Sequence, residues 1–167
     1  ALRTGQWRIT VAVYRERKVV AIWPGYHDTA LGMAFDIGST TIAAHLVDLA
    51  SGEALASAGR MNPQIRFGEG LMSRVSYVMM HPGAEKQMCE AVRTAVAELI
   101  VEVCAEAEQT PDNILDCTFV GNPIMHHLLL GLSPVELGGA PFALATDSAV
   151  TVSAQTLDLG INPGARC

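Results

Sequence analysis

The sequence contains no long apolar run, which excludes one class of protein at once. A helix that crosses a membrane needs about 18 or more consecutive apolar residues. The longest candidates here, 33–37 and 42–50, are the size of a strand and carry charges. Half of the 167 residues are hydrophobic, and the mean hydropathy is +0.28. Because a chain near this length hides roughly 70% of its extended surface on folding, we expect a single domain with a substantial core and no membrane partner.

Basic residues are scarce outside the first 22 positions. The net charge is −6, and residues 1–22 carry +4, so residues 23–167 carry −10. A surface that binds nucleic acid needs clustered Lys and Arg side chains to neutralise phosphates. We therefore expect no nucleic-acid partner, and we interpret the basic N-terminal segment as a solvated surface.

The four cysteines form no CxxC pair and lie near no Cys/His cluster. Their spacing therefore predicts neither a zinc site nor an iron–sulfur cluster. Cys89 and Cys104 fall within one helical pattern, where a thiol is usually a small core residue. The chain also starts without a signal peptide, so we expect reduced thiols and a cytoplasmic location.

The order of the predicted elements indicates a fold class. Two alternating strands are joined around Arg15–Arg17, and residues 32–61 predict three more strands with tight, antiparallel connections. Helices, a buried strand and a short helix follow. This βββαβα order predicts an α/β fold of the ribonuclease-H-like type, with a mixed sheet flanked by helices. We place a linking region with a β-hairpin at 1–30 and one lobe at 31–167.

The helical segments differ in strength. An apolar stripe predicts a long helix from about Ala84 to Glu108, and a weaker pattern precedes it from Leu71. Thr110 followed by a proline predicts a brief helical turn. The tail after Gly131 has weak periodicity and several Pro and Gly residues, so we expect loops, a short strand and an edge. We expect the methionines to fill gaps in the core: Met72, Met79, Met80 and Met88.

The segment AFDIGSTTIAAHL (34–46) joins two of the predicted strands through a polar turn. A turn that binds phosphate needs a glycine for close approach, successive N–H groups and hydroxyls that add donors. Gly38, Ser39, Thr40 and Thr41 supply these groups. Asp36 stands at the end of an apolar strand, where an unpaired carboxylate is costly unless it meets a cation or hydrogen-bond donors. An ordinary hairpin turn with a conventional Asp and Gly is the alternative.

Several segments resemble a known family. GMAFDIGSTTIAAHLVDLASGEALA, NPQIRFGEGLMSRV, VGNPIMHHLLLGLSPVELGGAPF and INPGA are similar to the actin-like (ASKHA) ATPase domain of the reductive activators of corrinoid proteins, which are ferredoxin-fused ATPases. The resemblance runs from about Trp7 to Ala165. The phosphate motif alone is shared with the wider actin, sugar-kinase and chaperone ATPase superfamily. The segments around NPQ and VGNP narrow the resemblance to the activators of corrinoid proteins.

The resemblance implies an enzyme that uses ATP and Mg²⁺ to drive one electron onto the cob(II)alamin of a corrinoid protein. The phosphate motif of the family maps onto Asp36, Gly38 and the three hydroxyl residues Ser39, Thr40 and Thr41. Asp36 is then the metal-directing carboxylate. Gly121 and Asn122, between a strand and a helix N-terminus, are expected to face the γ-phosphate or the attacking water, and we group Asn122 with Asp36 as catalytic.

Two differences from the family pattern bear on these expectations. Family members carry an Asp where this chain has Gly70, so the role of that acidic residue is missing here. The superfamily also uses a second lobe with its own phosphate loop and adenosine-binding glycines, which this sequence lacks, as it lacks the cysteines of a [2Fe–2S] domain. We interpret the chain as a first lobe that does not turn over ATP on its own, because transfer needs groups on both sides of the phosphate. A bare lobe face favours self-association, so a homodimer is expected.

Two other functions were weighed. A nuclease of the same fold would use Asp36, Glu102 and Asp116 as ligands for two Mg²⁺ ions, but the acidic body provides no basic channel for nucleic acid. A non-catalytic interaction domain with a vestigial phosphate turn stays open as the alternative.

Other polar residues have weaker assignments. Asn62 and Gln64 fit the lining of a nucleotide cleft, a partner surface or ordinary loop amides. Arg66 and Arg74 fit a phosphate or an acidic partner, but exposed helix arginines are commoner, so we include neither in the site. His126 and His127 point about 100° apart on a helix and cannot share a metal ion, so we expect packing or a single polar contact.

Overall fold

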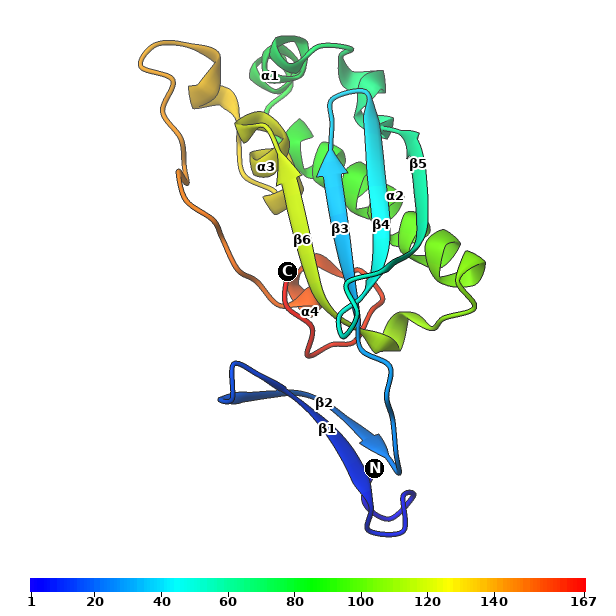
Figure 1. Cartoon of the computed structure of the whole chain (residues 1–167). Coiled ribbons are helices and arrows are strands. Elements are labelled where there is room, and N and C mark those ends of the chain that lie inside the picture. Colours follow the sequence, from blue (N-terminus) through cyan, green and yellow to red (C-terminus); the bar gives the residue numbers. More distant parts are fainter.

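The computed structural model describes residues 1–167 and contains two separate sheets. The first is an antiparallel hairpin of β1 (Ile9–Tyr14) and β2 (Lys18–Pro24). It projects away from the rest of the chain, as Figure 1 shows at the bottom of the view. The two strands and the turn between them match the sequence prediction.

The second sheet forms the body of the protein and has the order β5-β4-β3-β6. The strands β3 (Leu31–Ile37), β4 (Thr41–Asp48) and β5 (Ala54–Met61) form an antiparallel meander. The strand β6 (Ile114–Gly121) returns after a helical crossover and pairs with β3 in parallel. The predicted α/β class, with a mixed sheet flanked by helices, is therefore confirmed.

The helices follow the predicted order. The long helix α2 covers Ala84–Glu106 and is preceded by the shorter α1. Short 3₁₀ turns link the elements, including the brief turn expected after Thr110. None of the helices is both long and apolar enough to span a membrane. The remaining elements are η1 (Pro63–Phe67), α1 (Leu71–Met80), η2 (Pro111–Asn113), α3 (Pro123–Leu130), η3 (Val135–Gly138) and α4 (Ala154–Leu157).

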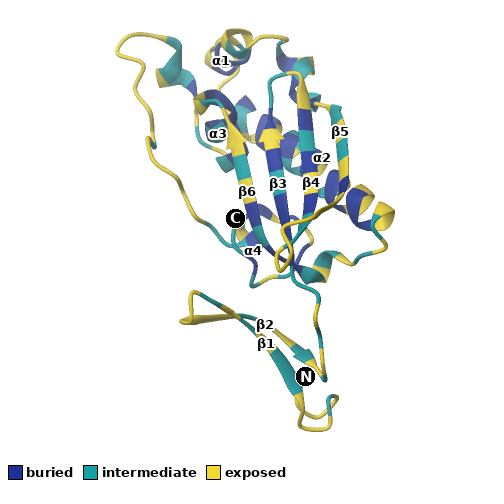
Figure 2. Ribbon diagram, viewed as in Figure 1, coloured by how far each residue is buried: buried dark blue, intermediate teal, exposed yellow.

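The core lies between the sheet and α2, which packs behind β4 and β5 (Figure 1). Side chains alternate along the strands, so Phe35 and Leu46 are buried whereas Asp36 and His45 are exposed. Figure 2 shows this alternation as dark and light bands along the sheet. The helix contributes a fully buried stripe: Met88, Val92, Val96, Leu99 and Val103. The methionine prediction holds for Met88 but is wrong for Met72, Met79 and Met80, which are 49–70% exposed.

The tail after α3 is more ordered than its weak periodicity predicts. The four-residue helix α4 was not predicted, because one turn of helix has too few residues to show a period. At the end of the chain, the N–H of Arg166 donates to the carbonyl of Leu115 at 3.1 Å, and its carbonyl accepts from Cys117 at 2.7 Å. The last residues therefore lie beside β6, on the edge of the sheet away from β3.

One side chain links the projecting hairpin to the body. The guanidinium of Arg166 donates to the hydroxyl of Tyr14 on β1 at 2.5 Å and to the carboxylate of Asp116 on β6 at 2.9 Å. It also lies 4.5 Å from the centroid of the Tyr14 ring. Gly164 meets the hairpin nearby, where a Cβ would come within 2.0 Å of the Val20 carbonyl. Arg166 thus tethers β1 to β6.

The tether predicts a change in protease sensitivity. Replacing Arg166 by Ala should free the hairpin, and chymotrypsin should then cut after Tyr26, which is 88% exposed in the linker, several-fold faster than in the parent chain. The matched control is Arg17→Ala, because Arg17 is exposed at the hairpin turn and its side chain makes no hydrogen bond. Equal cleavage rates for the two variants would show that Arg166 does not hold the hairpin.

The turn between β3 and β4 is tight. The N–H of Gly38 donates to the carbonyl of Thr41 at 3.0 Å. A Cβ at position 38 would lie 2.5 Å from that same carbonyl oxygen, closer than a real Cβ approaches, whereas at Gly59 on β5 the nearest atom is 3.6 Å away. Glycine is therefore required at 38 by the closeness of the backbone.

This difference gives a second prediction. Gly38→Ala should lower the free energy of unfolding by about 1–3 kcal/mol, because the turn has to widen around the added methyl group. Gly59→Ala should change it by less than about 1 kcal/mol, since a Cβ there makes only ordinary van der Waals contacts and alanine loses less entropy than glycine. Urea unfolding followed by circular dichroism measures both. An equal effect of the two substitutions would contradict the proposed crowding at Gly38.

Candidate functional site

The structure brings the two predicted site segments to one edge of the sheet. Because β3 and β6 are parallel, their carboxyl ends lie side by side, with Ile37 opposite Gly121. The close approach also requires a small residue, since a Cβ on Gly121 would lie 3.0 Å from the Ile37 carbonyl. The turn 38–41 and the start of α3 therefore lie next to each other. Their role in binding remains a prediction.

Three consecutive carbonyl groups of the turn face into the protein. The carbonyl of Gly38 accepts from the side-chain amide of Asn62 at 2.8 Å, and that of Thr40 accepts from the backbone N–H of Asn62 at 2.7 Å. Between them, the carbonyl of Ser39 accepts from the guanidinium of Arg74. In a planar trans peptide the carbonyl and the next N–H point in opposite directions. The N–H groups that follow each of these carbonyls therefore face away from the protein interior.

The outward-facing groups are available to a ligand. The N–H groups of Ser39 and Thr40 donate no hydrogen bond, and neither do the hydroxyls of Ser39, Thr40 and Thr41. Only the N–H of Gly38 is used, in the turn itself. Successive free N–H groups in a bend form an anion-binding concavity. The turn can thus hold a phosphate oxygen without breaking any hydrogen bond of the chain.

Asp36 lies immediately before this turn. Its side chain is exposed and takes part in no ion pair or hydrogen bond, and its neighbours across the sheet are Ala43 and Val120. An exposed carboxylate with small or apolar neighbours suits a hydrated Mg²⁺ ion, which binds through one or two carboxylates and the phosphates of a ligand. The residues present therefore fit the cation that the sequence predicts.

Asn122 caps α3 and has part of its side chain left for a ligand. Its Oδ1 accepts from the N–H of Met125 at 3.1 Å, and its carbonyl accepts from the N–H of His126 at 2.9 Å. Pro123 occupies the first helical position, where its missing N–H costs nothing. The two Nδ2 donors of Asn122 form no hydrogen bond. They are the donors by which this side chain could contact a phosphate oxygen.

A cavity of about 400 Å³ borders the site between β6, α3 and the tail. It meets the site at Ile37 and Gly121 and is mostly apolar. Burial and the neighbouring His127 lower the pKa of His126, which lines the cavity. His127 is buried, and its Nδ1 donates to the Pro123 carbonyl at 2.7 Å while its Nε2 accepts from Ala145 at 3.0 Å. This histidine therefore packs and holds the tail.

Three residues beneath the turn have a role that the sequence analysis missed. Asn62, Gln64 and Arg74 are at most 1% exposed, so the expectation of an exposed Arg74 is wrong. Gln64 accepts from Arg74 at 3.2 Å and donates to the Met88 carbonyl at 2.9 Å. Burial lowers the pKa of the Arg74 guanidinium. The spacing of NPQ and SRV could have identified these residues, since both segments helped to carry the family resemblance.

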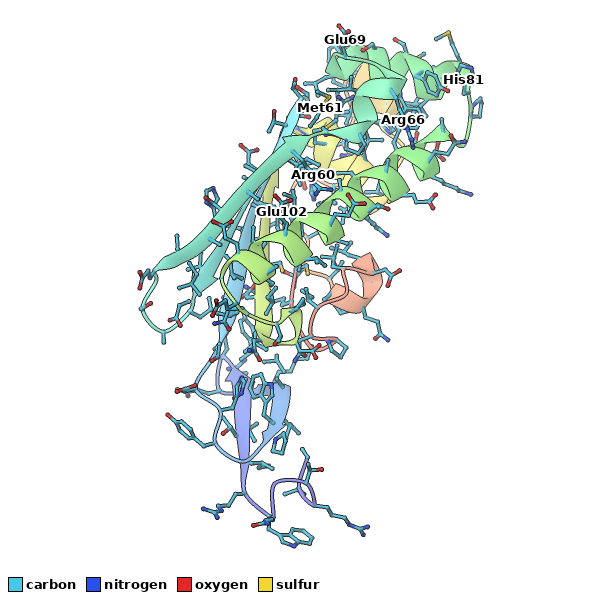
Figure 3. All side chains as sticks on the ribbon, turned by 90° about the vertical axis from the view of Figure 1, so that its right-hand side faces the viewer. Arg60, Met61, Arg66, Glu69, His81 and Glu102 are labelled. Carbon is cyan, nitrogen blue, oxygen red and sulfur yellow. The ribbon has the colours of Figure 1, made fainter.

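The acidic residues of the nuclease alternative do not meet. Glu102 of α2 pairs with Arg60 of the edge strand β5 at 3.1 Å (Figure 3). Asp116 pairs with Arg166 at 2.9 Å and lies opposite Gly32, four residues from Asp36 along the strand. At about 3.3 Å per residue this separates the two aspartates by more than a two-metal site spans.

The chain is 36% identical over 132 residues to the corrinoid activation enzyme RamQ of Eubacterium limosum. The matched segment covers 79% of this chain and 22% of that protein. A solved structure of a reductive activator for a corrinoid, iron–sulfur protein superposes with a TM-score of 0.87 at 31% identity, over 99% of this chain and 27% of the other. The chain thus spans about a quarter of the length of these relatives.

A family model agrees with these two similarities and fixes the extent of the match. The model of the RACo middle region matches residues 31–167, from the first strand of the larger sheet to the end of the chain. The matched segment contains the turn, the buried residues beneath it and the cap of α3. On this match, the chain belongs to the RACo middle region family.

Proposed function

We propose that this chain is the first lobe of an ATP-binding module in a reductive activator of corrinoid proteins. The observation that carries the proposal is the orientation of the turn, in which the carbonyls of Gly38, Ser39 and Thr40 are held inward and the free N–H groups face out. This arrangement offers donors to a polyphosphate. Asp36, next to the turn, offers a carboxylate to its cation.

In this proposal, different residues of the chain contact different parts of the nucleotide. The N–H groups and hydroxyls of Ser39 and Thr40 would bind phosphate oxygens, and Asp36 would hold and orient the Mg²⁺ ion. When bound, the cation neutralises charge that develops on the phosphates. The free Nδ2 of Asn122 positions the terminal phosphate or the attacking water from the neighbouring strand. Hydrolysis needs further groups on the opposite side of the phosphate, so this lobe alone should bind nucleotide weakly and not hydrolyse it.

The rest of the activity belongs to the longer protein. The names of the two relatives concern corrinoid activation and reductive activation of a corrinoid, iron–sulfur protein. We infer that the parent of this chain uses ATP to drive one electron from a [2Fe–2S] cluster in another domain to cob(II)alamin on a corrinoid partner. We expect the cluster in another domain, because Cys89 and Cys104 lie several turns apart on α2 and only Cys117 and Cys167 lie close together. Self-association of the isolated lobe is part of the same proposal.

A substitution in the full-length protein tests the role of Asp36. Asp36→Asn should reduce Mg²⁺-dependent ATP hydrolysis roughly 100-fold or more, because the amide cannot direct the cation. The fold should be unaffected, since Asp36 is exposed and makes no contact that the amide would break. Phosphate release measures the rate. Glu53→Gln is the matched control, because Glu53 is an exposed carboxylate at the opposite end of the sheet.

Calorimetric titration of the same full-length protein with Mg-ATP decides between the proposal and its alternative. A protein that binds its corrinoid partner normally but produces no heat with Mg-ATP would be an interaction module with a vestigial turn. Full hydrolysis by the Asp36→Asn variant would remove this carboxylate from the mechanism while leaving nucleotide binding intact.

A further inference from the structure

Arg74 is the only charged side chain that is fully buried, at 0% exposed. Its Nε donates to the Gly68 carbonyl at 2.9 Å, and its Nη1 lies 3.2 Å from both the Gln64 Oε1 and the Met125 sulfur. The fourth contact, from Nη2, is the Ser39 carbonyl of the turn. All these partners are neutral. The ion pairs of the chain involve only Arg60 and Arg166, so no carboxylate lies within 4.0 Å of the Arg74 guanidinium.

A buried charge without a counter-charge is costly and needs a reason. Burial lowers the pKa of this guanidinium, but an arginine in a protein stays protonated. Hydrogen bonding to the turn does not require charge, because the neutral amide of Asn62 holds the adjacent Gly38 carbonyl equally well at 2.8 Å. A positive charge therefore lies beneath the turn, although a neutral side chain could donate the same hydrogen bond to a carbonyl of the turn.

The position of the charge identifies its partner. The Ser39 carbonyl and the Thr40 N–H belong to one peptide unit, so a cation on the carbonyl polarises the outward-facing N–H and strengthens it as a donor to an anion. Arg74 is inaccessible, so no ligand touches it, and its charge acts across this one peptide. The exposed end of the same peptide is where the proposed function places the phosphates. Hydrogen bonds with an ionised partner are roughly twice as strong as neutral ones.

We propose that Arg74 is a positioning residue whose buried charge is compensated by the polyphosphate of the bound nucleotide across the Ser39–Thr40 peptide. It makes the site select ligands by the negative charge of their phosphate group. This inference rests on the proposed function and adds to it a residue that contacts neither the ligand nor the cation.

The test uses the full-length protein and three ligands that differ in charge: Mg-ATP, Mg-ADP and adenosine. Arg74→Met, which removes the charge at similar length, should weaken Mg-ATP binding about tenfold or more, Mg-ADP less, and adenosine not at all. Arg74→Lys keeps the charge without the planar fork and should restore most of the preference for ATP over ADP. The matched control is Arg66→Met, since Arg66 is exposed on the preceding turn, packed over Phe67 (Figure 3). Its affinities should equal those of the parent.

Each result is informative. Unchanged affinities in a folded Arg74→Met variant would overturn the inference while leaving the proposed function standing. If that variant fails to fold, Arg74→Lys decides alone. A ratio of the ADP and ATP dissociation constants equal to that of the parent supports a charge effect. Loss of the preference for ATP in a folded Arg74→Lys protein shows instead that only the planar fork of the guanidinium matters. A parent protein that binds no Mg-ATP would instead overturn the proposed function itself, and the inference with it.

Discussion

The structure of the site depends on one constraint, the inward orientation of three consecutive carbonyl groups in the turn 38–41. Fixing a carbonyl also fixes the N–H of the same peptide unit, because the unit is planar and trans. Asn62 holds the first and third carbonyls from the end of β5, and Arg74 holds the second from α1. Asn62, which follows β5, and Arg74 of α1 therefore fix the shape of a turn that lies much earlier in the sequence. Without these contacts the turn would be an ordinary hairpin connection.

The sheet topology places everything else around that turn. A hairpin alone would present the turn and Asp36, but the parallel return of β6 adds a second segment at the same edge. The residue after β6 caps α3 through its Oδ1, which fixes its side chain and leaves two donors free. The helix α2 packs on β4 and β5 with a stripe that is fully buried. The chain thus brings three separate stretches of sequence to one edge of the sheet, where the proposed function places the nucleotide.

Local patterns were sufficient for the strands and α2 but not for α4 or for the residues beneath the turn. The strands and α2 were predictable because their periods of two and 3.6 residues persist over many residues. The order of the elements then indicated the fold class. Arg74 was predicted wrongly because an arginine on a short helix is usually exposed, and its burial is decided by contacts with Ser39 and Met125, which are 35 and 51 residues away. The exposed methionines on α1 show the same limit, since the apolar residues of this helix extend beyond the face that the fold buries.

The buried charge also links ligand binding to the stability of the region around α1. Any ligand that binds only the folded protein stabilises it. A ligand that compensates a buried charge stabilises most strongly the part of the fold that contacts the charged side chain. Arg74 belongs to α1 and bonds the Gly68 carbonyl and Gln64 in the connection before it. The helix α1 also contacts η3. There Gly138 packs so closely on Val75 that a Cβ on Gly138 would lie 2.7 Å from the Val75 side chain. Under the proposed compensation, the energetic effect of the phosphates is distributed over α1 and its neighbours, because the guanidinium of Arg74 is bonded to that part of the fold.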